Sequence, residues 1–368
     1  MKPWVLGAAL AALLAFAPGA GAAPPKGFYG VAISGPAIDG TLSLSAQLQR
    51  IRRAGGDQVT VAFNWADVDP GGPPEQAPEH WESLDRMVTL AARRHLRIVP
   101  VLVQAPSWAR TDPSRPFSPP KDPAAFGAWT GRVAARYGAR GTFWKAHRLL
   151  PKLAIRDWQV WNEPSGGNGV DDPSVFWQKD GPWADDYVAL LKAAHTAVRA
   201  ADPSARILLG GLVGRSWEAL ALLYDAGAGP YFERVALHPY TGDPHDVDKI
   251  LQYCRTEMAK HGDAKVPFVL TEFGWPSFNS DEYQRLGAKK IAKYQAQWAQ
   301  TAIAELTYER IKLRIASIFW FTWVSHDTSA GDAFDYAGLT RLTPGGKVVA
   351  KPSLKVFSRW ALKARYRR

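Results

Sequence analysis

Residues 157–164 read DWQVWNEP, a short apolar run that leads into a glutamate, Glu163. Residues 266–275 repeat this design as VPFVLTEFGW, in which the apolar run ends at Leu270 and Thr271 precedes Glu272. Short apolar runs of this kind are typical of strands buried on both faces of a parallel sheet. A carboxylate at the C-terminal end of such a strand is typical of barrel proteins that place their functional residues at that end. We therefore expect Glu163 and Glu272 to share one end of a barrel.

The remainder of the chain alternates apolar runs with helical patterns, which predicts an α/β fold with a parallel sheet. Helical periodicity covers residues 44–54, 81–94 and 187–200, and residues 353–364 form a plausible closing helix. Eight strand–helix units in one domain predict a (β/α)8 TIM barrel. The first turn after a strand, residues 34–36, has no dinucleotide-binding fingerprint, which argues against a Rossmann fold. The eight expected strands are residues 28–33, 58–63, 97–103, 157–161, 206–212, 234–237, 268–270 and 315–320.

The first 22 residues have the pattern of a secretion signal. Lys2 supplies the positive start, residues 5–16 are apolar, and residues 20–22 are small. We expect a signal peptide over 1–22, a single catalytic barrel domain over 23–368, and a secreted, periplasmic or cell-envelope protein. No later segment has the length and apolarity of a membrane span, so we expect no stable membrane insertion after signal removal. The alternative is a signal retained as an anchor.

The chain of 368 residues carries 45 basic and 34 acidic side chains, a net charge of +11. No stacked basic and aromatic strand or recognition helix accompanies this charge, so we expect no nucleic acid partner. The excess predicts a solvated basic surface, with attraction to an anionic polymer or cell envelope as the alternative. The one cysteine, Cys254, excludes an intramolecular disulfide and is expected to be a small buried side chain in a helix over 246–261.

Two glutamates on separate barrel strands can flank one bond, which is the arrangement that glycoside hydrolysis needs. When two carboxyl groups lie close together they do not both ionise easily, so one keeps its proton and can act as an acid. The alternative is that each glutamate caps the helix that follows its strand. Capping does not require an apolar strand before both residues, so we favour the catalytic interpretation.

The sequence resembles the retaining glycoside hydrolases of the clan that carries catalytic glutamates on barrel strands four and seven. Within that clan it is most similar to glycoside hydrolase family 39 and its cellulase-like bacterial relatives. The resemblance implies that Glu163 is the acid/base, that Glu272 is the nucleophile, and that Asn162 binds the 2-hydroxyl of the sugar. It rests on the two glutamate motifs and on residues 106–108 (PSW), 135–138 (ARYG), 238–240 (HPY), Trp320, 338–339 (GL) and 351–352 (KP).

Several further side chains are expected to bind the carbohydrate substrate. In the relatives a tyrosine at the position of Tyr240 hydrogen-bonds the nucleophile, and His238, two residues earlier on the strand, would face the same side. Trp320 is expected to form a platform for a sugar ring, because aromatic faces pack on the C–H face of sugars. For Asn162 the alternative is a helix cap, and for His238 a core histidine. Other candidates near strand ends are Asn64, Trp65, Trp108 and Trp275.

No histidine spacing typical of a metal site occurs, so we expect neither a metal nor an organic cofactor. One residue departs from the clan pattern. Members often carry an arginine on strand two that supports the nucleophile, and the matching position here is Thr60, with Asn64 and Trp65 as substitutes. This departure supports one alternative to a hydrolase, a carbohydrate-binding barrel without turnover. A second alternative is a transglycosylase that uses the same site with a different acceptor.

Overall fold

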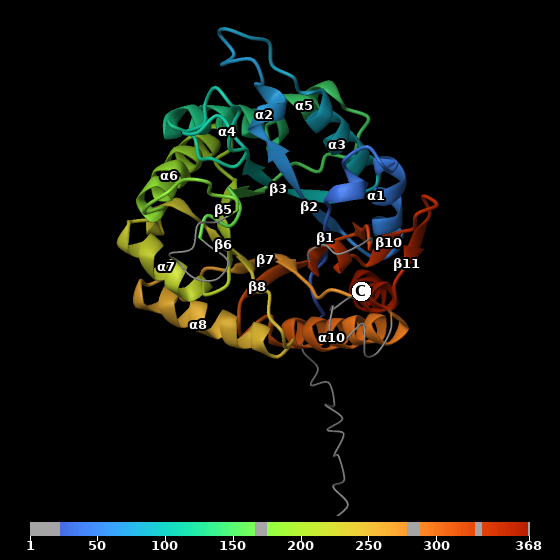
Figure 1. Ribbon diagram of the computed structural model, residues 1–368. Helices are drawn as coiled ribbons and strands as arrows, with labels where there is room; N and C mark the ends of the chain where they lie inside the picture. The colour runs from blue at the N-terminus through green and yellow to red at the C-terminus, as the bar shows by residue number, and fades with distance from the viewer. Residues whose placement is uncertain (1–22, 166–174, 278–287, 328–332, 367–368) are drawn as a thin grey trace, which may run out of the picture.

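The computed structural model describes residues 23–165, 175–277, 288–327 and 333–366. The expected signal peptide, residues 1–22, lies outside them. Eight parallel strands pair in chain order and close into a barrel, with β1 against β8. Helices surround this barrel in a ring (Figure 1). The strands are β1 (Tyr29–Ala32), β2 (Gln58–Asn64), β3 (Arg97–Val103), β4 (Asp157–Val160), β5 (Arg206–Val213), β6 (Arg234–His238), β7 (Phe268–Phe273) and β8 (Ile315–Trp320).

The (β/α)8 barrel predicted from the sequence is therefore confirmed. All eight expected strands are present, and β3 and β8 have the predicted bounds. The largest difference is at β7, which continues to Phe273 and so includes Glu272. The described helices are α1 (Leu44–Arg53), α2 (Trp65–Val68), α3 (Glu82–Arg93), α4 (Pro123–Tyr137), α5 (Thr142–Ala146), α6 (Ala184–Ala201), α7 (Ser216–Asp225), α8 (Asp246–Lys260), α10 (Ala288–Glu309) and α11 (Pro352–Tyr366).

Side chains from five strands fill the inside of the barrel and form a cluster separate from the main core. Phe319 of β8 is the largest of them. Gly30 of β1 faces it, and a Cβ atom there would lie 2.3 Å from the Phe319 ring, so only glycine leaves room for this ring. The barrel is thus packed by side chains, as in other barrels of this size. The cluster consists of Val99, Leu208, Ala236, Val269 and Phe319.

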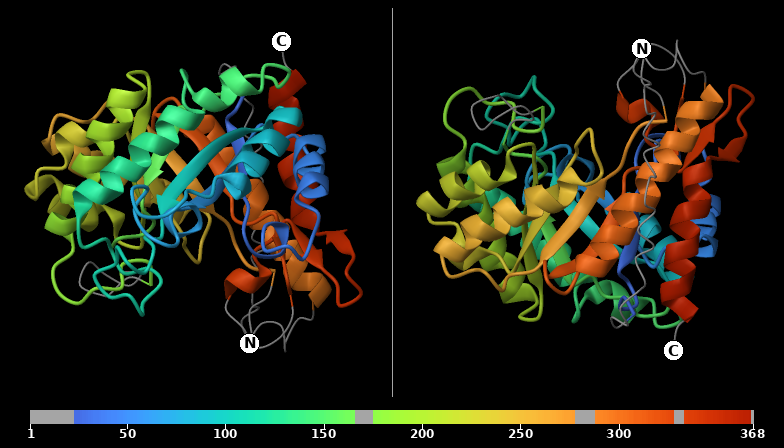
Figure 2. Two further views of the ribbon diagram at one scale, coloured as in Figure 1. Left: turned by 90° about the horizontal axis from the view of Figure 1, so that it is seen from above. Right: turned by 90° about the horizontal axis from the view of Figure 1, so that it is seen from below.

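The chain leaves the barrel after β8 through a small sheet and a final helix. This sheet has the order β11 (Val348–Ala350), β10 (Thr340–Leu342), β9 (Val324–Ser325). Helix α11 then packs along α10 and ends near the start of β2, where the guanidinium of Arg365 donates to Asp57 at 3.1 Å. The last turn of α11 consequently lies at the end of the barrel where the strands begin (Figure 2).

Cys254 is buried in α8, as expected. Within the described part of the chain, none of the helices has both the length and the apolarity that crossing a bilayer requires.

Candidate active site

Glu163 and Glu272 come together at the end of the barrel where the strands finish. Glu163 follows β4, and Glu272 is the next-to-last residue of β7. One carboxylate oxygen of each, together with a ring nitrogen of His238, lie within 4.8 Å of one another. The side chains of Glu163 and Glu272 are 17% and 18% exposed. Both carboxylates can therefore be reached from solvent, which a bond-cleaving pair requires.

The backbone after β4 takes an unusual path that directs Glu163 to this end. Trp161 has φ 63° and Glu163 has φ 42°, both in the left-handed region. Two contacts hold this path to β5 and α6. The amide of Glu163 donates to the carbonyl of Gly210 at 3.1 Å, and the Tyr187 hydroxyl donates to the carbonyl of Val160 at 2.9 Å. Non-glycine residues persist in this region only where the surroundings enforce it.

His238 lies close to both glutamates. Its side chain is buried at the end of β6, with Nδ1 2.7 Å from Glu163 Oε1 and 3.7 Å from Glu272 Oε2. The second nitrogen, Nε2, lies 3.0 Å from the hydroxyl of Thr271. A Cβ atom on Gly211 of β5 would lie 2.8 Å from Nε2, so glycine is required for the strand to pass this close to the imidazole. His238 is thus a fully partnered histidine inside the site.

Tyr240 contacts the second glutamate. Its hydroxyl donates to Glu272 Oε2 at 2.7 Å. The sequence placed His238 and Tyr240 on one strand, but β6 ends at His238, and Tyr240 reaches the site from the turn that follows. Its ring packs edge-on against Phe334 at 5.0 Å and Phe321 at 6.3 Å between centroids.

The electrostatics of the site depend on burial and on His238. Burial raises the pKa of Glu272, and the negative charge of Glu163 adds to this rise, while His238 and the Tyr240 hydroxyl oppose it. Burial disfavours a charged His238, yet Glu272 and Glu163 together raise the pKa of this imidazole above its usual value. The pKa of Glu272 rises because desolvation disfavours the charged form of its carboxyl group.

Asn162 lies between the two strained residues and is largely buried. Its side-chain oxygen accepts from the amide of Gln159 at 3.3 Å, and Gln159 is completely buried. Gln159 also donates to the carbonyl of Trp161 at 3.0 Å. The sequence did not single out Gln159, although a polar residue inside a buried strand is the kind of signal that marks such a support.

Trp320 does not form a sugar platform, so this prediction is wrong. The side chain is 0% exposed, donates to the carbonyl of Ala337 at 2.9 Å, and packs against Phe273 and Trp275. Alternation along β8 is the reason: Phe319 points into the barrel, so Trp320 points outward to the helices. The next residue, Phe321, packs against Phe334 at 5.7 Å beside Tyr240. The sequence analysis missed both phenylalanines.

The other tryptophans proposed for sugar binding are also core or supporting residues. Trp275 is buried and donates to the carbonyl of Thr241 at 2.7 Å. Trp65 is buried, stacks on Trp129 of α4 and donates to Asp69 at 2.8 Å. Trp108 is partly buried against Trp65 and donates to the carbonyl of Asp69. These contacts join neighbouring loops and leave no open aromatic face for a sugar at Trp65 or Trp275.

Strand β2 supplies no charged support to the nucleophile candidate. Thr60 is buried, and its hydroxyl has no hydrogen-bond partner among the described residues. Ala62 follows on the same face of the strand and is exposed, and the amide of Asn64 donates to Asp67 at 3.1 Å. In the described part of the chain Glu272 pairs with His238 and with no lysine or arginine. The support expected from an arginine thus comes from His238 and Tyr240.

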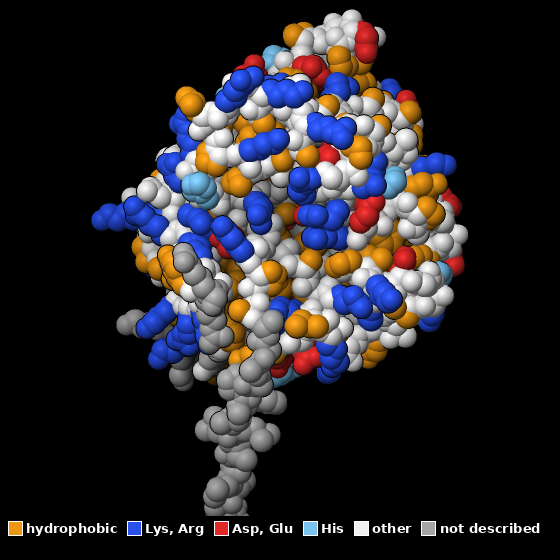
Figure 3. All heavy atoms as spheres, turned by 180° about the vertical axis from the view of Figure 1, so that it is seen from behind, with side chains coloured by type: hydrophobic (Ala, Val, Ile, Leu, Met, Phe, Trp, Pro, Cys, Tyr) orange, Lys and Arg blue, Asp and Glu red, His pale blue; other side chains and the backbone are white. Residues whose placement is uncertain are grey.

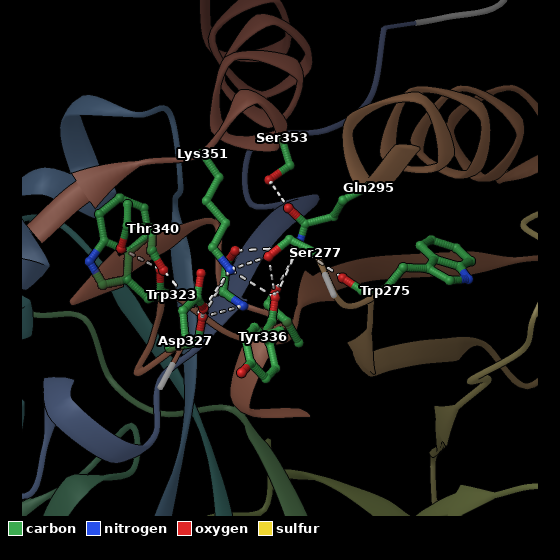
Figure 4. A network of polar contacts seen from close by, with 12 residues as sticks. Trp275, Ser277, Gln295, Trp323, Asp327, Tyr336, Thr340, Lys351 and Ser353 are labelled. Atoms are coloured by element: carbon green, nitrogen blue, oxygen red, sulfur yellow. Dashed lines mark hydrogen bonds and ion pairs between the residues drawn. The ribbon is translucent and has the colours of Figure 1, made fainter. Parts of the chain in front are cut away.

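A buried lysine ties together the segments that follow β7 and β8 (Figure 4). The Lys351 ammonium donates to Ser277, to Asp327 and to the carbonyl of Tyr336, each at 2.8 Å. Burial lowers the pKa of Lys351 from its usual 10.5 to about 8, although Asp327 opposes this. Tyr336 belongs to the 3₁₀ turn Ala333–Tyr336, which also carries Phe334. The network therefore fixes the turn that packs on Tyr240.

Glu163, His238 and Glu272 are also a donor set that could bind a divalent cation. In this structure Glu163 and His238 bond one another at 2.7 Å. That separation is a hydrogen bond between the two groups, and a cation between them would have to displace it. The expectation that no metal is needed stays a prediction.

No protein-family model matches the sequence, and no curated protein matches it. Solved structures do match. They include a family 39 glycoside hydrolase from Bacteroides cellulosilyticus WH2, with 17% identity, a TM-score of 0.64, and 92% of this chain and 64% of that chain covered. A monomeric β-xylosidase from Caulobacter crescentus CB15 has 17% identity and a TM-score of 0.63, with 92% and 68% covered. An endo-β-1,4-glucanase from Xanthomonas axonopodis pv. citri, a triple mutant, has 13% identity and a TM-score of 0.60, with 91% and 99% covered.

This chain spans 64% of the length of the family 39 enzyme. At these identities the likeness concerns the fold. The chain shares its (β/α)8 barrel with family 39 and related glycoside hydrolases.

Proposed function

We propose that this chain is an exported retaining glycoside hydrolase that cleaves a β-glycosidic linkage of a poly- or oligosaccharide. One observation carries the proposal: Glu163 and Glu272 present carboxylate oxygens within 4.8 Å of one another at the open end of the barrel. Retaining glycosidases hold their carboxyl groups about 5–5.5 Å apart, whereas inverting enzymes need about 6.5–9.5 Å to admit a water molecule. The fold shared with glycoside hydrolases supports the same conclusion.

In the first step Glu272 attacks the anomeric carbon as the bond to the leaving oxygen breaks. Glu163 gives its proton to that oxygen, and a covalent glycosyl–enzyme ester forms on Glu272. In the second step Glu163, now ionised, takes a proton from a water molecule. This water attacks the anomeric carbon, releases Glu272 and leaves the sugar with its original configuration.

The surrounding residues have supporting parts in this scheme. Tyr240 donates to Glu272 and holds the carboxylate in position for attack. His238 orients Glu163 through Nδ1 and stabilises negative charge on both glutamates. Asn162, beside Glu163, is placed to bind the 2-hydroxyl of the sugar, a contact that strengthens in the transition state. No metal or organic cofactor takes part.

A panel of aryl β-glycosides and β-linked polysaccharides, assayed with wild type and Glu272→Gln in parallel, tests the proposal. We expect wild type to hydrolyse members of the panel without added metal, and chelation to leave the rate unchanged. Proton NMR of the first-formed product should show the β-anomer before mutarotation. An α-anomer appearing first would contradict retention, and saturable sugar binding without turnover would favour a carbohydrate-binding barrel.

A further inference from the structure

The end of the barrel where the strands begin carries a strong positive charge. The connection between α4 and β4, residues 138–156, contains five lysines and arginines and no acidic residue. The connection between α10 and β8, residues 310–314, has no acidic residue and carries the exposed cations Lys312 and Arg314, whereas Arg310 is buried. Figure 3 views this face from behind Figure 1 and shows lysine and arginine side chains spread widely over it, with hydrophobic side chains between them.

A hollow of about 210 Å³ opens in the first of these connections, around α5. It is lined by four cationic side chains and by Trp144, whose indole is buried. The cations are exposed, and none of them forms an ion pair with another residue in the described parts of the chain. Four like charges around one hollow repel one another, so an anion that enters it is stabilised. The cations are Arg140, Lys145, Arg148 and Lys152.

Apolar side chains project from the same face. Leu149, next to Arg148 of the hollow, is fully exposed. Ile311, in the other cationic connection, and Tyr366, at the end of α11, are exposed as well. A polyanionic sugar has C–H faces on which an aromatic ring can pack, but it has no acyl region that an aliphatic side chain such as Leu149 could enter. A bilayer offers both phosphate groups for the cations and an acyl boundary for the apolar tips.

We propose that this face binds the surface of an anionic phospholipid bilayer. The hollow receives the phosphate of a lipid head group, Leu149 enters the boundary between head groups and acyl chains, and the remaining cations contribute long-range attraction. The proposal is independent of the proposed hydrolase activity. It places the barrel with Glu163 and Glu272 directed away from the membrane, toward the medium that would hold a polymer substrate.

Vesicle sedimentation tests this directly. The chain without residues 1–22 is mixed with vesicles of phosphatidylcholine containing phosphatidylglycerol, and with vesicles of phosphatidylcholine alone. We expect binding to the anionic vesicles only, reversed by high salt. Replacing Lys145, Arg148 and Lys152 together by glutamine should weaken it roughly a hundredfold, because each cation near an anionic surface contributes about fivefold. Leu149→Ser should weaken binding roughly tenfold with little change in its salt dependence.

The matched control removes three cations from the opposite end: Arg215→Gln, Lys249→Gln and Lys347→Gln together. It has the same net charge as the triple variant, and we expect its affinity to stay within about threefold of wild type, since charges beyond a Debye length are screened. Thermal melting and turnover of a soluble glycoside check that each variant is folded. An equal loss of vesicle affinity in both triple variants would show that binding depends on net charge alone. Binding to a soluble anionic polysaccharide but not to vesicles would show that the ligand of this face is that polymer. Either result overturns the proposal.

Discussion

The two ends of the barrel differ in charge and in shape. At the end where the strands finish, the connection over residues 65–81 carries four acidic side chains and no lysine or arginine, and Glu163 and Glu272 face the medium. At the end where they begin, residues 138–156 carry five cations and no acidic residue. Both sets sit on connections of the same eight strands. The proposed chemistry and the proposed membrane attachment would therefore be able to change independently on one scaffold.

The largest expected effect is at the end with the carboxylates. Glu272→Gln should lower turnover by on the order of 10⁴ or more, because the covalent step then has no nucleophile. Its affinity for anionic vesicles should remain that of wild type. Initial rates and vesicle sedimentation measure the two quantities. The matched control is Glu257→Gln in the last turn of α8, a glutamate that precedes β7 and pairs with Lys260. This variant should stay within about twofold of wild type in rate.

Glu163→Ala tests whether Glu163 is the acid/base of the pair. Substrates with poor leaving groups should slow by roughly 10²–10⁴, whereas activated aryl glycosides need no proton and should form the intermediate at a nearly normal rate. Azide should restore turnover and yield a β-glycosyl azide, because this anion attacks without base assistance. An α-configured azide would contradict the role of Glu163.

The pH dependence of activity should report the burial of Glu272. A nucleophile must be ionised, so the rate should fall as the pH drops through the pKa of Glu272, which burial raises above the usual value for a glutamate. His238 opposes that rise. His238→Asn should therefore move the acid limb of the kcat/KM profile to higher pH. An unchanged limb, with the fold intact by circular dichroism, would mean that His238 does not stabilise the ionised form.

The smallest expected effect concerns Lys351, which anchors the wall of the site. Its pKa is about 8 in the folded chain against 10.5 ordinarily, so between these pH values the unfolded state binds more protons. The free energy of unfolding should consequently gain a contribution that rises with pH across this window and is absent below it. Denaturant titrations from pH 7 to 10.5 should show this rise in wild type and lack it in Lys351→Met. Parallel curves for the two proteins would contradict the lowered pKa.

The sequence was sufficient to predict the strands and to place Glu163 and Glu272 at one end of the barrel. It was not sufficient to predict which side chains of β8 face the site. Strands of a closed parallel barrel are buried on both faces, so alternation of Ser317, Trp320 and their neighbours does not tell which side is inward. Only the packing of Phe319 against Gly30 in the folded barrel shows that Phe319 points inward. Phe321 was therefore missed, and Trp320 was assigned its place. Trp65 begins α2, beyond the end of β2, and its ring packs on α4.

Lys351 belongs to a motif of the family resemblance, but the sequence around it does not indicate its network of partners. Its partners Ser277, Asp327 and Tyr336 lie up to 74 residues away, and each is an ordinary loop residue when viewed alone. Only the tertiary fold assembles them. The raised pKa of Glu272 was also beyond sequence reasoning, because it depends on the burial of this carboxyl and on its neighbours in the folded site.

The left-handed backbone at Glu163 has a thermodynamic consequence. A glutamate with φ 42° is less stable there than glycine, by about 1–3 kcal/mol at a strained position. Glu163→Gly should therefore raise the melting temperature while it removes the acid/base. If a barrel needed only to fold or to bind a sugar, this glutamate would lower its stability without any compensating function. Under the proposed function, the chain trades stability for reactivity at this residue.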